Sequence, residues 1–277
     1  MTAASSETIR LPADYYQQFD ADHSLEVPAE GYTGWQTAEV EISRDKTALV
    51  VMHAWDAATY EEYPGWWKAV EYIPRANEIC RTVFPPVLEA VRESGMTVLH
   101  VVGGADYYKQ VPGYLRAVEL AGPAPPPPPY IPNDPVLDSL RAFRADHSSQ
   151  GPQNRADCSN GMNQTDFPAE ARPLDSEGVA ENDHQLFALC EEAGINHLIY
   201  MGFAINWCIL LSPGGMHDMQ RRGFMCSALR QATTAVENKE SARRQTAKEI
   251  GLWRVAVAYG FVFDVDPFVA ALKANGS

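Results

Sequence analysis

The pattern of apolar and polar residues along the chain predicts buried strands that alternate with helices. Residues 47–52 form a continuous apolar run, which is typical of a parallel strand covered on both faces. From 74 to 94 the apolar residues recur on one helical face, Gly95 ends the helix, and 96–102 predicts a second buried strand. A strand, a crossover helix and a strand in this order form a right-handed unit with parallel strands.

The same alternation resumes in the second half of the chain. We expect helices at 183–193, 208–222, 239–256 and 266–273, and strands at 198–201, 224–229 and 261–263. The helix from 208 is interrupted by Pro213-Gly214-Gly215. Together these elements predict an α/β fold, a three-layer α/β/α domain with a mainly parallel central sheet.

Two segments fall outside this rhythm. Residues 1–45 have little periodicity and predict an extended arm that packs on the domain or on a neighbouring subunit. Within the domain, which we place at 46–277, residues 104–175 form a long insertion with a stiff proline run at 123–129. The insertion has too little apolar periodicity for a core of its own, and long excursions of this kind serve as lids or subunit contacts, or are disordered.

Composition excludes several classes of protein. The chain has 277 residues and a net charge of −14, which disfavours nucleic acid and anionic membranes as partners. No apolar run is long enough to span a membrane, and residues 1–10 lack the apolar core of a signal peptide. The five cysteines are scattered, without a pair at metal-binding spacing, which favours a reducing cytoplasm over a disulfide framework.

Cys208 is the first candidate for chemistry. It follows an apolar strand and a short turn, and it begins the next predicted helix. Open α/β folds bind their ligands at the carboxyl ends of their strands. A helix N-terminus lowers the pKa of a thiol, and the thiolate is its reactive form. The alternative is an inert buried cysteine, since free cysteine is among the residue types most often buried.

These motifs resemble the isochorismatase-like, or cysteine hydrolase, superfamily. The matching stretches are Ala48-Leu49-Val50-Val51-Met52-His53, Gly202-Phe203-Ala204-Ile205-Asn206-Trp207-Cys208 and Arg222-Gly223-Phe224. The resemblance implies a cysteine that attacks the carbonyl carbon of a small amide, helped by an aspartate and a lysine. It also implies a cis peptide between Phe203 and Ala204, and an oxyanion site formed by backbone N–H groups at these two residues and at Cys208.

The other two members of the family triad differ here. His53 occupies the position of the aspartate, and residues 173–182, where the family has its lysine, contain none. An imidazole can serve as the base near neutral pH, and Asp56 could orient it. Alternatively, His53 is a core histidine and Asp56 caps the following helix.

Further residues are candidates for binding substrate. Asn206 and Trp207 lie beside the cysteine, Trp55 follows the first strand, and Glu181 lies near the position of the missing lysine. Trp55 belongs to an aromatic stretch that predicts either a pocket wall or a subunit interface. No spacing typical of a metal site occurs, and no organic cofactor is implied.

The sequence therefore predicts a cysteine hydrolase that cleaves a small amide or related acyl C–N bond through a Cys208 thioester, with His53 as the base. The alternative is a non-catalytic relative that binds a small ligand or a protein partner in the inherited pocket. We expect a small-molecule substrate, no nucleic-acid or membrane partner, and a homo-oligomer, either a dimer or a tetramer.

Overall fold

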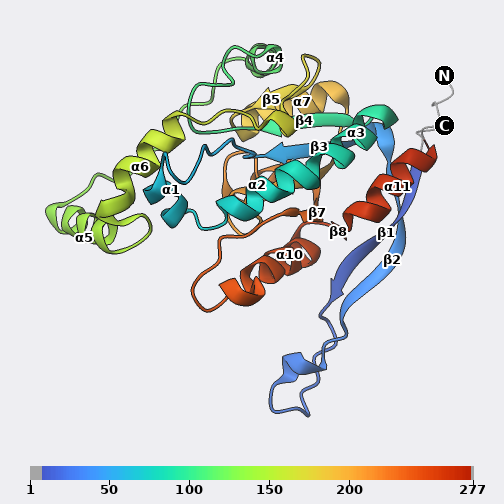
Figure 1. The fold of residues 1–277 in the computed structure, drawn as a ribbon. Coiled ribbons are helices and arrows are strands. Elements are labelled where there is room, and N and C mark those ends of the chain that lie inside the picture. The colour runs from blue at the N-terminus through green and yellow to red at the C-terminus, as the bar shows by residue number, and fades with distance from the viewer. Residues whose placement is uncertain (1–7, 276–277) are drawn as a thin grey trace.

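A computed structural model describes residues 8–275, which form one eight-stranded sheet flanked by helices (Figure 1). The strand order is β2-β1-β8-β7-β6-β3-β4-β5. The strands are β1 (Thr8–Gln17), β2 (Gly34–Ser43), β3 (Thr47–Met52), β4 (Thr97–Val101), β5 (Gly178–Ala180), β6 (His197–Gly202), β7 (Met225–Thr233) and β8 (Val262–Phe263).

The helices lie between and beyond these strands. In chain order they are α1 (Pro64–Ala69), α2 (Ile73–Thr82), α3 (Phe84–Ser94), α4 (Pro112–Ala121), α5 (Pro135–His147), α6 (Gly151–Asn163), α7 (Asp183–Ala193), α8 (Cys208–Leu211), α9 (Met216–Arg221), α10 (Thr246–Ala258) and α11 (Val265–Asn275). None of the helices in the described part of the chain has both the length and the apolar character of a membrane span.

The central sheet is parallel from β8 to β5, which confirms the predicted α/β class. Its two faces bury separate cores, because successive residues of a strand point to opposite sides. In β3, Leu49 and Val51 pack in the core beneath α2, α3 and α11. Val50 and Met52 pack in the core beneath α4, α7, α9 and α10. The molecule is therefore a three-layer α/β/α domain.

The N-terminal segment is more regular than the sequence pattern indicated. β1 and β2 are two ten-residue strands that form an antiparallel hairpin, whose far end projects from the body (Figure 1). β1 also joins the edge of the parallel sheet through one pairing, Asp14 with Val262. Ile9 and Leu11 are buried in the core, so this part of the arm belongs to the domain.

Two other expectations are corrected. The single helix predicted at 74–94 is two helices, α2 and α3, because Pro85 and Pro86 begin a new helix after Val83. The insertion contains three helices, α4, α5 and α6, and its proline run forms neither helix nor strand. α5 and α6 extend away from the sheet beside α1 (Figure 1).

Candidate active site at the carboxyl edge of the sheet

The turn after β6 places Cys208 at the carboxyl edge of the sheet. Gly202 ends the strand with φ +120°, and a methyl group there would lie 1.9 Å from the Met52 carbonyl oxygen, so only glycine fits. The peptide bond between Phe203 and Ala204 is cis, as the family resemblance implied. The chain then turns, and Cys208 is the first residue of α8, as the sequence predicted.

Cys208 differs from the other cysteines in its accessibility. All five lie in the described part of the chain, and Cys208 is half-buried, whereas the other four are buried. Burial nevertheless raises the pKa of the Cys208 thiol, and the Ser212 hydroxyl and the Ala204 N–H beside the sulfur offset only part of this effect. The direction is opposite to that expected from the helix N-terminus. α8 has only four residues, so its dipole is small.

The backbone around this turn provides fewer free donors than the resemblance implied. The Phe203 N–H donates to the Met52 carbonyl at 3.0 Å and is therefore occupied. The Ala204 N–H faces the Cys208 sulfur. The Cys208 N–H has no acceptor within the helix because the residue begins it. Ala204 and Cys208 thus remain the candidates for binding an oxyanion.

His53 follows β3 on the strand next to β6, so the sheet brings it to the same edge as the Cys208 turn. Its backbone is in the left-handed region, with φ +48°, and its N–H donates to the Val101 carbonyl at 2.9 Å. The ring stacks on Trp55 with centroids 5.2 Å apart, and a methyl group at Gly103 would lie 3.3 Å from its Nε2. Burial lowers the pKa of His53 to about 4, so the imidazole is neutral at pH 7.

Within the described residues, no hydrogen bond joins His53 to Cys208. Tyr72 connects the two regions. Its ring is 8% exposed and lines a cavity of ≈ 20 Å³ together with His53 and Phe203. Its hydroxyl is near enough to Cys208 that a thiolate there adds to the effect of burial in raising the pKa of Tyr72.

Sequence reasoning had placed Tyr72 only within a general aromatic stretch. Its position beside the thiol depends on the start of α2, and the sequence gives no separate signal for that contact.

Asp56 lies at the same edge but does not orient His53 in this structure. Its carboxylate is exposed and accepts the Ala58 N–H at 3.1 Å, and its own N–H donates to the Asp166 carbonyl at 2.8 Å. His53 Nδ1 is enclosed and has no hydrogen-bond partner. Asp56 therefore stabilises its own turn, which is close to the capping role that the sequence left open.

The remaining predicted residues have different surroundings. Asn206 clamps the turn to the segment after β7, because its amide both donates to and accepts from the Val236 backbone at 2.9 Å. Trp207 is 61% exposed. Glu181 ends β5 and accepts hydrogen bonds from the hydroxyls of Tyr108 and Tyr114 at 2.8 and 2.9 Å. These contacts occupy Asn206 and Glu181 in holding the structure together.

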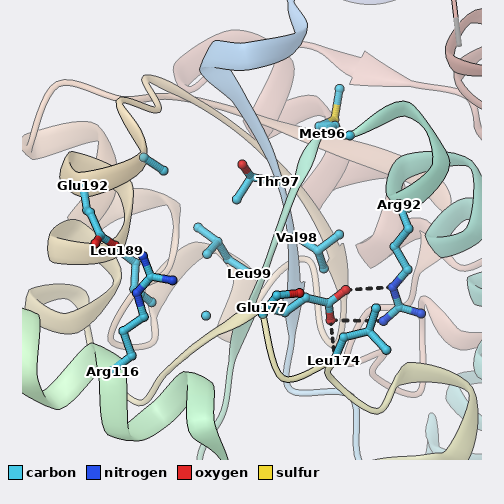
Figure 2. A pocket seen from close by; sticks show the side chains of 14 residues that line it. Arg92, Met96, Thr97, Val98, Leu99, Arg116, Leu174, Glu177, Leu189 and Glu192 are labelled. Carbon is cyan, nitrogen blue, oxygen red and sulfur yellow. Dashed lines mark hydrogen bonds and ion pairs between the residues drawn. The ribbon is translucent and has the colours of Figure 1, made fainter.

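A second cavity, of ≈ 280 Å³, lies at the opposite edge, where β4 and β5 begin (Figure 2). Its wall includes the Glu177 carboxylate, which is paired with Arg92 at 2.7 Å and with the buried His100 at 2.8 Å. Arg116 lines it from α4, paired with Glu192 of α7. It contains no thiol and none of the residues predicted for the site.

Known proteins were compared with the chain at the level of sequence and of structure. No family model matches the sequence, and no curated protein matches it. One similar solved structure is a cysteine hydrolase from Pseudomonas syringae pv. phaseolicola 1448A, with TM-score 0.47 and 11% identity over 84% of this chain and 95% of that chain.

Another is an isochorismatase-like hydrolase from Alkaliphilus metalliredigens, with TM-score 0.46 and 16% identity over 82% of this chain and 97% of that chain. A pyrazinamidase/nicotinamidase from Streptococcus mutans UA159 gives TM-score 0.36 and 10% identity over 78% and 99%. In its structure the chain is similar to isochorismatase-like and cysteine hydrolase proteins.

Proposed function

We propose that the protein is a cysteine hydrolase that cleaves a small amide or a related acyl C–N bond. One observation carries the proposal: the half-buried thiol of Cys208 stands at the start of a helix, at the edge where β3 and β6 end. A nucleophile at this edge of an open α/β sheet is placed where such folds bind their ligands. Nearby lie a histidine and two backbone N–H groups, the types of group that acyl transfer uses.

The proposed reaction has two steps. In the first, the Cys208 sulfur attacks the carbonyl carbon, the thiol proton passes to His53, and the C–N bond breaks as the proton is given to the leaving amine. In the second, water attacks the thioester, a proton again passes through His53, and the carboxylic acid and the free thiol are released. His53 is neutral above about pH 4, so a ring nitrogen has a free lone pair for each proton, and its lowered pKa makes it a weaker base than a free imidazole.

The test is to screen the purified protein against a panel of small primary amides, with ammonia release as the readout. The wild type should release ammonia from at least one amide, and Cys208→Ala should lower the rate at least about 10³-fold. Cys80→Ala, which removes a buried thiol of α2, is the matched control and should retain activity. Equal rates for Cys208→Ala and the wild type would exclude the thioester route.

A second candidate is a non-catalytic protein that binds a small ligand or a partner at this edge. The observation that favours it is the raised pKa of Cys208, together with the absence, within the described residues, of a hydrogen bond between the His53 ring and the Cys208 sulfur. Iodoacetamide labelling separates the two candidates. An activated Cys208 reacts faster than an unfolded thiol, and His53→Ala slows it. A slow Cys208 and no ammonia from any amide would favour the non-catalytic protein.

A further inference from the structure

Helix α5, at the far end of the insertion, carries its large apolar side chains on the surface. No residue of the helix is buried, and Val136, Leu140 and Phe143 are 61–70% exposed. The preceding Tyr130 and Ile131 are almost fully exposed. Soluble monomers rarely expose large contiguous apolar patches, and those that they do expose mark sites of interaction. The outer surface of α5 is therefore a candidate interface.

The apolar residues of α5 share one face of the helix. Val136, Leu140, Phe143 and His147 follow each other at intervals of four, three and four residues, which places them in one row. We call this row the α5 stripe. The rings of Phe143 and His147 are stacked with centroids 4.0 Å apart, so the row is continuous there. Leu137, on another face, is half-buried.

The rest of the molecule holds α5 without covering the stripe. Arg155 of α6 pairs with Asp146 at 2.9 Å and donates to the Ala145 carbonyl at 3.2 Å. Asp134 caps the N-terminus of the helix by accepting two backbone N–H groups. Helices of about 13 residues are marginal in water on their own, because most helical stability in proteins comes from packing an apolar face. The α5 stripe lacks that packing in a single copy of the chain.

The α5 stripe is complementary to a second copy of itself. Its intervals of four, three and four residues read the same in both directions. In an antiparallel pair of α5 helices, related by a two-fold axis near the middle of the stripe, Leu140 of each copy lies opposite Phe143 of the other. Val136 then lies opposite His147. A two-fold interface joins identical surfaces, so it requires a pattern that matches its own reverse.

The charge of α5 also permits a second copy to approach. The chain has a net charge of −14, so two copies repel each other over most of their surfaces. Within α5, however, Asp138 and Asp146 are balanced by Arg141 and Arg144. The helix is therefore neutral, in contrast to the chain as a whole.

We propose that the α5 stripe is a contact between two copies of this chain, paired antiparallel about a two-fold axis. A helix of thirteen residues is about 20 Å long, so the pair buries less than the ~1,200 Å² at the lower limit of a standard interface. The contact is therefore weak and reversible, and it depends on protein concentration.

Sedimentation velocity of the full chain, from about 1 to 500 µM, measures the association. The mass of the particle should double within this range, with a dissociation constant on the order of 1–100 µM. Leu140→Glu and Phe143→Glu place a charge at the centre of the stripe, and each should raise the dissociation constant at least about 100-fold. Leu115→Glu, at a 52% exposed residue of α4, is the matched control and should leave it unchanged.

Disulfide formation tests the antiparallel arrangement. The variants carry Cys208→Ala as well, because the other four native cysteines are buried. A mixture of Leu140→Cys and Phe143→Cys chains should form a link between residues 140 and 143 under mild oxidation, identified by mass spectrometry of the digested dimer. A mixture of Val136→Cys and Leu140→Cys chains should form no such link, because these positions lie about 10 Å apart along the helix axes.

A particle mass that stays constant up to 500 µM would overturn the proposal, as would association that neither charge variant weakens. If a charge variant fails to fold, the cross-link decides, and absence of the link between residues 140 and 143 would overturn the antiparallel pair. A Leu140→Glu variant that is less stable but has an unchanged particle mass would show that the stripe packs within its own chain, which also contradicts the proposal.

Discussion

The two edges of the central sheet differ in the hydrogen bonding of their buried polar groups. At the amino edge, the Glu177 carboxylate accepts from Arg92 at 2.7 and 3.0 Å, lies 2.8 Å from His100 Nε2, and accepts the Leu174 N–H at 3.0 Å (Figure 2). At the carboxyl edge, the enclosed Nδ1 of His53 has no hydrogen-bond partner. The buried carboxylate at one edge is fully paired, whereas the imidazole at the other edge lacks a partner at Nδ1.

The pKa values express the same contrast. Burial alone raises the pKa of Glu177, but hydrogen bonds from His100 and Arg92 outweigh it and bring the value to about 2. His53 has only burial, which lowers its pKa to about 4. Fully paired networks stabilise a fold, whereas unpartnered groups destabilise it and persist where function requires them. The comparison therefore assigns stability to the amino edge, and the carboxyl edge is where we propose the chemistry.

The largest effect should come from breaking the amino-edge network. Glu177→Ala leaves His100 buried without its partner and removes the carboxylate that pairs with Arg92. Loss of one member of a buried ion pair costs about 3–5 kcal/mol, so the free energy of unfolding in urea should fall by that amount. The alkylation rate of Cys208 in the folded protein should stay unchanged, because the network lies at the other edge.

Glu192→Ala is the matched control, since Glu192 pairs with Arg116 in the same cavity wall but is 40% exposed. Its loss should cost about 0–1 kcal/mol. Equal costs for the two variants would contradict the assignment of stability to the buried network.

As the pH is lowered, the buried groups at the two edges should lose their contributions to the free energy of unfolding in different pH ranges. The pKa of His53 is 6.5 when unfolded and about 4 when folded, so between these values the unfolded chain binds more protons and stability falls as pH falls. The shift corresponds to about 3 kcal/mol, complete near pH 4. Glu177 has a folded pKa of about 2, so its contribution is lost only as pH falls below about 4.5.

The measurement is the free energy of unfolding from pH 8 to pH 3. Burial also lowers the pKa of His197 to about 4, so this histidine titrates in the same pH range. The test is therefore the difference between the curves of the wild type and of a His53 variant. His53→Asn, which suits a positive φ, should flatten the curve between pH 6.5 and 4 relative to the wild type and leave it unchanged below pH 4. Parallel curves for the two proteins would mean that His53 is not a buried neutral base.

The sheet was predictable from sequence wherever a local pattern decided the outcome. The run at 47–52 and the helix at 183–193 have the predicted bounds, because full burial and a one-sided helical face leave strong signals. The prediction of a single helix at 74–94 was wrong because two adjacent prolines begin a new helix within this range. α5 escaped notice because its apolar residues, among them Phe143 at 63% exposure, do not pack into the domain core.

The site was predictable only in part, because its contacts join distant segments. Cys208 and the cis peptide followed from one continuous motif. The cavity beside His53 combines residues after β3 with residues of α2 and with Phe203 after β6, and no local sequence pattern predicts that these segments meet. The sequence predicted a lowered pKa for the Cys208 thiol, and this direction was wrong. Burial by neighbouring segments raises the pKa by more than the dipole of a four-residue helix lowers it. The roles of His53 and Asp56 in catalysis remain predictions.

Adjacent tyrosines offer a smaller test of the comparison. The Tyr107 hydroxyl has only neutral neighbours for hydrogen bonding, the Trp55 indole N–H and the Gly103 N–H, whereas the Tyr108 hydroxyl donates to the Glu181 carboxylate at 2.8 Å. Because hydrogen bonds to a charged group are the stronger ones, Tyr108→Phe should lower the free energy of unfolding by about 2 kcal/mol and Tyr107→Phe by about 1 kcal/mol. Chemical denaturation of the two variants measures both. A larger loss for Tyr107→Phe than for Tyr108→Phe would contradict this order.

The smallest effect should come from Asp56, and it concerns whether the carboxyl edge contains a charge relay. The exposed carboxylate accepts one N–H, from Ala58, and leaves His53 Nδ1 unpartnered. Asp56→Ala should therefore lower the free energy of unfolding by about 0.5 kcal/mol and leave the pH dependence of Cys208 alkylation unchanged. If instead the variant slows alkylation as much as His53→Ala does, Asp56 must turn toward the imidazole in the reacting state. The two residues would then act as a dyad, and His53 would have a partner after all.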